Sequence, residues 1–522
     1  MKNNKQAYRE MIVAYFNDFG VLRETGREYW GIQIVNFLDC TFYFAMLTIA
    51  TVFLSEDLGL NDKQAGYSTA LFTSATSLML FVSGLYTDWL GIRRSLRFSM
   101  AAMLVLRLGV VVVGLVPTLP HRGLLASGLF LLMAPFMAAI QTVFQSSCKR
   151  FTTKRSRSAG FNLWYLFMNI GAAAAGFSID IVRKLLHLPN VHIFTMGVVT
   201  ALLCLVVGMM MVKREAQVVG PGEEPETKAD DANEPHKGPW QAMREVIREP
   251  ALWRLLVLVA LILGVRAVYA YLYLLMPKYW LRTIGPDAAI GTLNAINPVG
   301  IVIGLILFIP IANRFNVFLM LVYGAMVSAF SLFPLAMPWQ WYSPDIAWAH
   351  YLMALVCMVI VTVGEVLWSP KLYEFTAAIA PKGQEGTYLG LSLLPWFLAK
   401  TVVSAFSGHM LEYWCPEKVN INGVATPLQQ ALIHHQVPYW HSPAAMWLIL
   451  GAYALGGCII AAFLRGWLTQ GAHWKVEPGA DHPRAGDSAG GVSEKGSPAQ
   501  RERAPGAEAA QSAHDTQGHQ GG

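Results

Sequence analysis

The chain has 522 residues, of which 54% are hydrophobic and only 14% are charged, and its formal net charge is +6. A soluble globular protein usually carries about 25% charged residues, so this composition excludes an ordinary soluble domain and indicates a membrane protein. The six cysteines are scattered without paired spacing, which argues against a disulfide framework or a zinc site.

The first 30 residues are polar and mixed in charge. They lack the short apolar core of a cleavable signal peptide, so we expect residues 1–30 to form a cytoplasmic N-terminal segment. A membrane-spanning helix needs about 20 mostly apolar residues. By this criterion the sequence predicts twelve spans, at 31–54, 64–87, 95–116, 122–147, 158–181, 190–212, 251–276, 287–312, 316–336, 347–373, 386–412 and 443–467.

A long polar connection separates the sixth span from the seventh. Within it, residues 215–234 hold seven acids and a single lysine, a composition typical of a disordered linker. Residues 239–249 then resume the spacing of a surface helix. Six spans, a linker and six spans are typical of two halves that rock against each other. We therefore expect helix bundles at 31–212 and 251–467, the linker at 213–250 and a disordered cytoplasmic tail at 468–522.

Basic residues concentrate in the loops that follow the second and fourth spans, at 93–97 and 149–157. The positive-inside rule places these loops in the cytoplasm and, with an even number of spans, both termini as well. The basic run is therefore interpreted as a topology signal, and no nucleic-acid partner is expected. The sequence predicts a multi-pass protein of the plasma membrane, or of the inner membrane in a bacterium.

The loop after the second span contains a spaced motif that includes Gly84, Asp88, Gly91, Arg93 and Arg94. Gly84 permits close helix approach, Asp88 ends the helix, and Gly91 supports a tight turn. The two arginines can reach carboxylates or helix ends across the boundary between the halves. The motif resembles the loop signature of the major facilitator superfamily, in which it latches the cytoplasmic gate.

Three further segments narrow the resemblance. Phe161–Gly171, Leu293–Pro298 and Gly364–Pro370 resemble the corresponding segments of the proton-dependent oligopeptide transporters. This resemblance implies an all-α membrane protein with twelve transmembrane helices in two pseudo-symmetric six-helix bundles. The chain departs from that family in the first span, where Asp39 stands without an arginine, and at Gln145, where the family carries a lysine. These departures leave open whether the transported solute is a peptide or another small molecule.

Two charged residues lie deep in the tenth and eleventh spans. A charge at the centre of a bilayer costs several kcal/mol, so it marks a pathway, a gate or an ion pair. We expect Glu365 to be the protonatable acid on the substrate side, and in the resembled family the equivalent glutamate meets the amino group of the substrate. Lys400 lies at a similar depth and is expected to be its partner; a purely structural ion pair is the alternative.

The first and seventh spans supply a second group of candidates. Asp39 and Arg266 are expected to bridge the two halves in one conformation and to separate in another, unless Asp39 caps a local hydrogen-bond network. Arg107, in the third span, is interpreted as part of an internal pair or as a snorkelling side chain. Tyr269 and Tyr273 can share a helix face with Arg266, and such a face suits an amphipathic or zwitterionic solute.

Asn162, Asn297, Trp368 and Trp396 are further candidates to line the pocket. No phosphate-binding loop and no nucleophile–base motif is visible, so neither ATP-driven transport nor an enzyme is expected. The outer histidines lack ligand spacing, so no metal is expected, and the proton gradient takes the place of a cofactor.

The sequence thus predicts a monomeric secondary active transporter in membrane lipid. It would move a small zwitterionic or peptide-like solute by alternating access, coupled to protons. One alternative is a proton-driven exporter of drug-like or lipophilic compounds. Another is a membrane sensor that does not transport.

Overall fold

The computed structural model describes residues 20–153, 156–213, 218, 248–312, 316–379 and 394–470. Helices dominate these residues, and the described part of each predicted span overlaps one helix or consecutive helices. The predicted N-terminal segment up to residue 19, most of the linker with its surface helix, and the tail beyond residue 470 lie outside the described residues.

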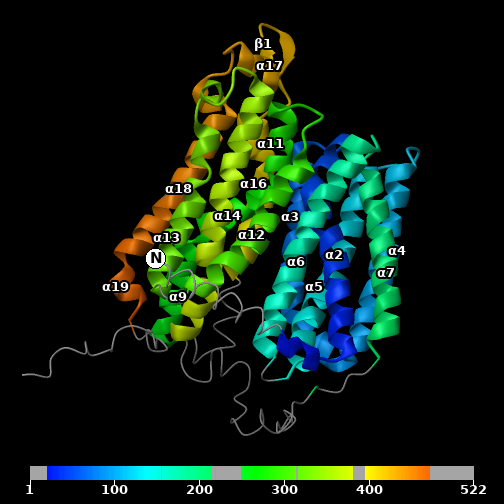
Figure 1. The fold of residues 1–522 in the computed structure, drawn as a ribbon. Helices are drawn as coiled ribbons and strands as arrows, with labels where there is room; N and C mark the ends of the chain where they lie inside the picture. Colours follow the sequence, from blue (N-terminus) through cyan, green and yellow to red (C-terminus); the bar gives the residue numbers. More distant parts are fainter. Residues whose placement is uncertain are drawn as a thin grey trace, which may run out of the picture. The chain divides into compact units, whose positions relative to one another are not determined.

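The first six spans form one group of helices, which we call the N-half (blue to cyan-green in Figure 1). It comprises η1 Val21–Glu24, α2 Arg27–Val52, η2 Phe53–Asp57, α3 Asp62–Leu90, α4 Ile92–Leu115, α5 Arg122–Arg150, α6 Arg157–Asp180, η3 Ile181–Leu185 and α7 Val191–Met211. Helix α3 begins with a capping box in which Asn61 and Gln64 satisfy each other's backbone amides. Between α3 and α4 the chain turns at Gly91, whose φ of 78° favours glycine.

The remaining spans form the C-half. Its elements are α9 Pro250–Leu261, α10 Leu263–Leu274, α11 Met276–Thr283, α12 Ile290–Ala312, α13 Val317–Phe330, η4 Phe333–Ala336, η5 Trp339–Trp341, α14 Ile346–Ile379, α16 Leu394–Trp414, β1 Lys418–Ile421, β2 Val424–Pro427, α17 Leu428–Ile433, η6 Tyr439–His441, α18 Pro443–Phe463 and α19 Arg465–Leu468. The seventh span is bent by 45° between α9 and α10. Pro277 stands in the first turn of α11, where a missing backbone amide is tolerated.

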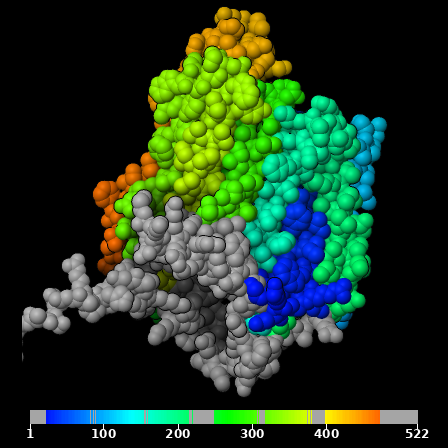
Figure 2. Space-filling view, viewed as in Figure 1, coloured from blue at the N-terminus to red at the C-terminus, as the bar shows by residue number. Residues whose placement is uncertain are grey.

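The two strands form an antiparallel hairpin in which Ile421 pairs with Val424. Asn422 and Gly423 make the turn, both with positive φ, as a tight hairpin turn requires. The hairpin and α17 project at one end of the bundle, at the top of Figures 1 and 2, where they are coloured orange. We call this the hairpin end.

By length and hydropathy, eight of the described helices can cross a membrane, and the bent pair α9–α10 makes a ninth. The twelve predicted spans are therefore supported in part by this criterion. Helix α12 contributes a shorter apolar stretch. Helices α3 and α16 carry polar side chains where they pack against each other, for example Ser74 against Thr401 at 2.9 Å between the hydroxyl oxygens.

The halves meet along two seams. Helix α3 packs along α16, and α6 packs along α12. In Figure 2 the surface passes without a break from α12 (green) to α6 (cyan). Helix α10 also contacts α2 between these seams. This arrangement brings side chains from the first, seventh and eleventh predicted spans close together.

Candidate functional site

The buried acid of the N-half is paired within its own bundle. Asp39 accepts a hydrogen bond from Arg107 Nη2 at 2.6 Å, and both side chains are fully buried. Arg107 Nη1 also donates to the Gly197 carbonyl at 3.1 Å and to the Thr200 hydroxyl at 3.3 Å, both on α7. In this structure Asp39 therefore pairs with Arg107 inside the N-half, and the predicted bridge to Arg266 is not made. Packing of α2 against α7, and of α7 against α4, offers Asp39 a closer cation.

Glu365 lies on α14, where it meets α12. One of its carboxylate oxygens accepts a hydrogen bond from Asn297 Nδ2 at 3.0 Å, and the same amide donates to Thr362 Oγ1 at 3.2 Å. Arg266 on α10 is an electrostatic neighbour of Glu365. The carboxylate is thus held by a neutral amide with a guanidinium nearby. Asn297, a predicted pocket residue, orients the acid.

Lys400 has a different partner from the one expected. Within the described residues, Glu365 accepts from Asn297 and has Arg266 as its charged neighbour, so the expected pair with Lys400 does not form. Lys400 Nζ instead donates to the Tyr43 hydroxyl at 3.1 Å, so this contact joins α16 to α2 across the halves. With Tyr273 and four other residues, Lys400 lines a gap of about 10 Å³, roughly the room for one water molecule.

Two predicted pocket residues belong instead to the core of the C-half. The Tyr269 hydroxyl lies 2.7 Å from Ser328 Oγ and donates to the Val361 carbonyl at 3.3 Å. Trp368 Nε1 donates to the Tyr269 and Ser328 hydroxyls, at 3.1 Å each. These polar atoms form hydrogen bonds with one another inside the C-half. Tyr269 and Trp368 therefore stabilise the core of that half and do not line a pocket.

The other predicted pocket residues are distributed differently. Tyr273 packs against Phe44 of α2, with ring centroids 5.4 Å apart, so it lies at the boundary between the halves. Arg266 places its guanidinium carbon 4.4 Å from the centroid of the Trp368 ring. Asn162 is exposed on α6. The side chain of Trp396 lies outside the described residues.

The predicted gate motif is only partly described. Gly91 makes the turn that its position predicts. Gly84 does not form the expected close helix contact, since a Cβ atom there would meet nothing within 4 Å. Arg93 donates to the Lys213 carbonyl just beyond α7, a helix end in its own half. Arg94 is exposed, and the side chain of Asp88 lies outside the described residues.

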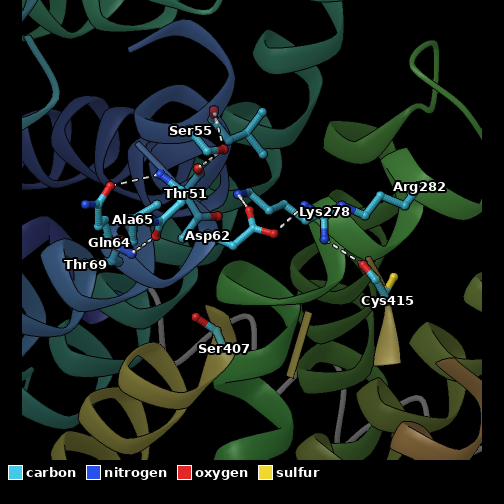
Figure 3. Close-up of polar contacts among 12 residues, drawn as sticks. Thr51, Ser55, Asp62, Gln64, Ala65, Thr69, Lys278, Arg282, Ser407 and Cys415 are labelled. Atoms are coloured by element: carbon cyan, nitrogen blue, oxygen red, sulfur yellow. Dashed lines mark hydrogen bonds and ion pairs between the residues drawn. The ribbon is translucent and has the colours of Figure 1, made fainter. Parts of the chain in front are cut away.

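A cluster that the sequence reasoning missed joins the halves at the hairpin end (Figure 3). Asp62, at the start of α3, makes ion pairs with Lys278 and, at 2.6 Å, with Arg282, both on α11. Burial alone would raise the pKa of Asp62, but these two cations hold it below its usual value. Lys63 adds an exposed ion pair with Glu412 of α16 at 2.6 Å. Asp62, Lys63, Lys278 and Arg282 lie outside the predicted spans, and Glu412 is the last residue of one, so hydropathy did not single them out.

The second seam, between α6 and α12, is closed at the hairpin end by hydrogen bonds from backbone amides to a carboxylate. Asp180, at the end of α6, accepts from the amides of Gly291 and Thr292 in the first turn of α12, at 3.0 and 2.6 Å. A Cβ atom on Gly291 would lie 2.0 Å from the Gly176 carbonyl oxygen. Only glycine permits this approach.

Among the described residues, no group of three or more histidine, cysteine, aspartate or glutamate side chains could hold a metal ion. Near the middle of the bundle, Asp39 and Arg107 form an ion pair, whereas Glu365 accepts from the amide of Asn297 and Lys400 donates to the Tyr43 hydroxyl. An acid held by a neutral donor, as Glu365 is, can bind and release a proton.

Comparisons with known proteins agree with this architecture. The sequence profile of the Major Facilitator Superfamily matches residues 32–403. No curated protein matches the sequence. One similar solved structure is that of the peptide transporter POT in complex with sulfate, at 15% identity and a TM-score of 0.62, covering 86% of this chain and 96% of that one.

Two further structures show the same fold. A bacterial homologue of the human drug peptide transporters is 16% identical with a TM-score of 0.62, and the match covers 85% of this chain and 99% of that chain. A structure described under substrate recognition in proton dependent oligopeptide transporters is 15% identical with a TM-score of 0.63, and it covers 85% and 98%. The predicted all-α fold of two helix bundles is therefore confirmed.

Proposed function

Because the chain belongs to the major facilitator superfamily, we propose that this membrane transporter moves a small zwitterionic or peptide-like solute by alternating access, coupled to protons. In this proposal the protein works in the plasma membrane, or in the inner membrane of a bacterium. Both termini lie in the cytoplasm and the hairpin end faces outward. The proton gradient is the energy source, and a monomer in lipid is the working unit.

The observation that carries the proposal is the setting of Glu365. Its carboxylate accepts from Asn297, a neutral donor, and not from a cation in a sealed ion pair. A carboxylate buried among helices is costly to ionise, so it exchanges its proton when access to water changes. Glu365 is therefore the proton-binding group of the proposed cycle.

The contacts at the hairpin end support alternating access. Asp62 with its two cations, and Asp180 with the first turn of α12, all join one half to the other. When the path opens outward these contacts have to break, since they cross both seams. Because these contacts exist only when the hairpin end is closed, they lower the free energy of the closed state relative to the open state. In the proposed orientation, the structure is the state closed to the outside.

The peptide-like class of solute is supported by the fold. The similar structures are of peptide transporters, and one is described as a proton dependent oligopeptide transporter. The segments that resemble this family in sequence include those that carry Asn297 and Glu365, and these two side chains are in contact. The proposed solute class therefore rests on two observations: the similarity of the fold to peptide transporters and the contact between Asn297 and Glu365.

The test is uptake of labelled alanyl-alanine into proteoliposomes that contain the purified full chain. We expect an imposed proton gradient, acidic outside, to drive accumulation above the level of passive exchange. Glu365→Gln is expected to abolish the response to the gradient while solute exchange between the two sides persists. The matched control is Glu417→Gln, an exposed acid next to the hairpin. Gradient-driven uptake by Glu365→Gln equal to that of the parent would contradict the assignment.

A further inference from the structure

We propose that the hairpin end holds a second binding site, separate from the path of the solute, for a neutral aromatic molecule that donates one hydrogen bond. The site is a cavity of about 340 Å³ inside the C-half, and its occupation favours the closed hairpin end. The binding itself is independent of the proposed function. Only its consequence for transport rests on that function.

The cavity lies where several elements of the C-half meet. Its walls come from α11, η4, η5, α14, α17, η6 and α18. Its volume falls in the usual range of ligand pockets, about 300–1,000 Å³. The described residues that line it all belong to the C-half, and neither Glu365 nor Lys400 is among them. The cavity is therefore distinct from the boundary between the halves.

The walls of the cavity are apolar and aromatic. Met337 and Met353 supply adaptable apolar surface, and Trp339 and Tyr439 supply aromatic rings. The described lining residues include no aspartate, glutamate, lysine or arginine. A charged or zwitterionic molecule would lose its hydration there without gaining an ionic partner. The walls therefore fit a neutral aromatic molecule and not the proposed solute.

A buried histidine sets the polar requirement of the site. His350 is 4% exposed and lines the cavity. Its Nδ1 lies 2.8 Å from the carbonyl oxygen of Ile346, one turn earlier on α14. A carbonyl oxygen can only accept, so Nδ1 carries the proton and Nε2 of the neutral ring is an acceptor. Among the described residues Nε2 has no hydrogen-bond partner, and it lies on the side of the ring away from that backbone carbonyl. A donor on the ligand would satisfy it.

One wall of the cavity belongs to the helix that binds Asp62. Tyr279 of α11 packs edge-on against His350, with ring centroids 6.0 Å apart. Lys278 and Arg282 are on the same eight-residue helix and make the ion pairs with Asp62 of the N-half. A molecule packed against Tyr279 and His350 would hold α11 against α14 and keep both cations in place. Because it binds best when this wall is assembled, it shifts the population toward the closed hairpin end.

The experiment compares indole with 1-methylindole, which keeps the two rings and lacks the N–H donor. Each is titrated calorimetrically into the purified full chain in lipid nanodiscs, and the heat from empty nanodiscs is subtracted. We expect the parent to bind indole about tenfold more tightly, a reasonable effect for one hydrogen bond to a buried acceptor. His350→Phe should bind the two molecules equally, because the acceptor is lost.

A second variant tests the cavity without changing the histidine. Ala444→Trp fills the cavity from the first turn of α18 and should bind neither molecule. The matched control is Val424→Trp, which adds the same ring at an exposed position of β2 outside the lining and should bind both as the parent does. Spin labels on the two halves at the hairpin end report the coupling. We expect indole to increase the population of short distances in the parent and not in Ala444→Trp.

The outcomes separate this inference from the proposed function. Equal binding of both molecules by the parent would overturn the role of His350, and indole binding by a folded Ala444→Trp variant at the parent affinity would overturn the site. Failure of the parent to bind indole would overturn both. Distances that indole leaves unchanged would overturn the coupling, and displacement of indole by alanyl-alanine would overturn the separation from the solute path. Gradient-driven uptake measured without indole tests the proposed function alone.

Discussion

The N-half and the C-half treat buried charge in opposite ways. In the N-half, Asp39 and Arg107 form an ion pair that is closed to solvent and supported by the backbone and a hydroxyl of α7. In the C-half, Glu365 is held by the amide of Asn297, and Lys400 reaches across to Tyr43. The N-half pair neutralises its own charges, and such a pair stabilises the bundle. Glu365 accepts from a neutral amide, so in the proposed function its carboxylate can bind and release a proton.

The largest expected effect comes from breaking the pair of the N-half. Arg107→Met leaves Asp39 buried without its cation, and loss of one partner of a buried pair costs about 3–5 kcal/mol. We expect a strongly lowered midpoint of thermal unfolding for the purified protein. The double variant Asp39→Asn/Arg107→Met should recover much of the loss, because no buried charge is left unpaired. Equal stability of Arg107→Met and the parent would show that the pair is not structural.

The next effect concerns the seam between α6 and α12. Gly291→Ala places a Cβ atom 2.0 Å from the Gly176 carbonyl oxygen, so the closed hairpin end has to separate. Overpacking of this kind costs about 1–3 kcal/mol. We expect distances between spin labels on the two halves at the hairpin end to increase. Gly84→Ala is the matched control, since a Cβ atom there meets nothing within 4 Å. An unchanged distance distribution in Gly291→Ala would contradict the proposed closure.

A smaller effect is expected from the ion pairs of the other seam. Asp62→Asn removes the acid shared by Lys278 and Arg282, and we expect the closed state to lose about 1–2 kcal/mol, since Asp62 is partly exposed. The same spin-label distances report the change.

The pH dependence of this contact follows from the sign of the shift. The pKa of Asp62 is held below its usual value while the ion pairs exist. Its contribution to the closed state is therefore complete above the ordinary carboxyl pKa, about 3.9, and is lost as the pH falls through the lowered pKa. We expect acid opening of the hairpin end in the parent and a weaker acid response in Asp62→Asn. Identical acid responses would exclude Asp62 as the responsible group.

The smallest expected change in stability is that of Glu365→Gln. It tests whether Glu365, unlike Asp39, contributes little to the stability of its bundle. Glutamine keeps an oxygen that accepts from Asn297, so the hydrogen bond of 3.0 Å can be retained. We expect the free energy of unfolding to change by less than about 1 kcal/mol. Thermal unfolding beside the uptake assay provides the measurement. A loss as large as that of Arg107→Met would make Glu365 a structural residue.

Much of the fold could be predicted from hydropathy alone. Within the described residues the predicted spans overlap helices, and eight or nine of these helices are long and apolar enough to cross a membrane, because a stretch of apolar residues with few charges is stable in a bilayer as a helix. The turn at Gly91 was predicted from its spacing. The hairpin at Lys418–Pro427 was not predicted, although Asn422–Gly423 is the dipeptide that tight hairpin turns prefer.

The site could be predicted only as a set of residues. Hydropathy identifies Asp39, Arg107, Glu365 and Lys400 as charges in hydrocarbon, but it does not say which of them meet. Asp39 was matched with Arg266 by their equivalent positions in the two halves, whereas the packing of α2, α4 and α7 brings Arg107 closer. Asp62 lay at a helix end, where a charge is ordinary, so its sequence position alone did not mark it.

The sequence by itself determined that this chain spans a membrane with helices and that a few charges lie deep among them, because the energy of burying apolar and charged groups depends on residue type. The pairing of those charges was decided only by the tertiary structure. Ion pairs and hydrogen bonds act over a few ångströms, and residues far apart in the chain reach that distance only when particular helix faces pack together.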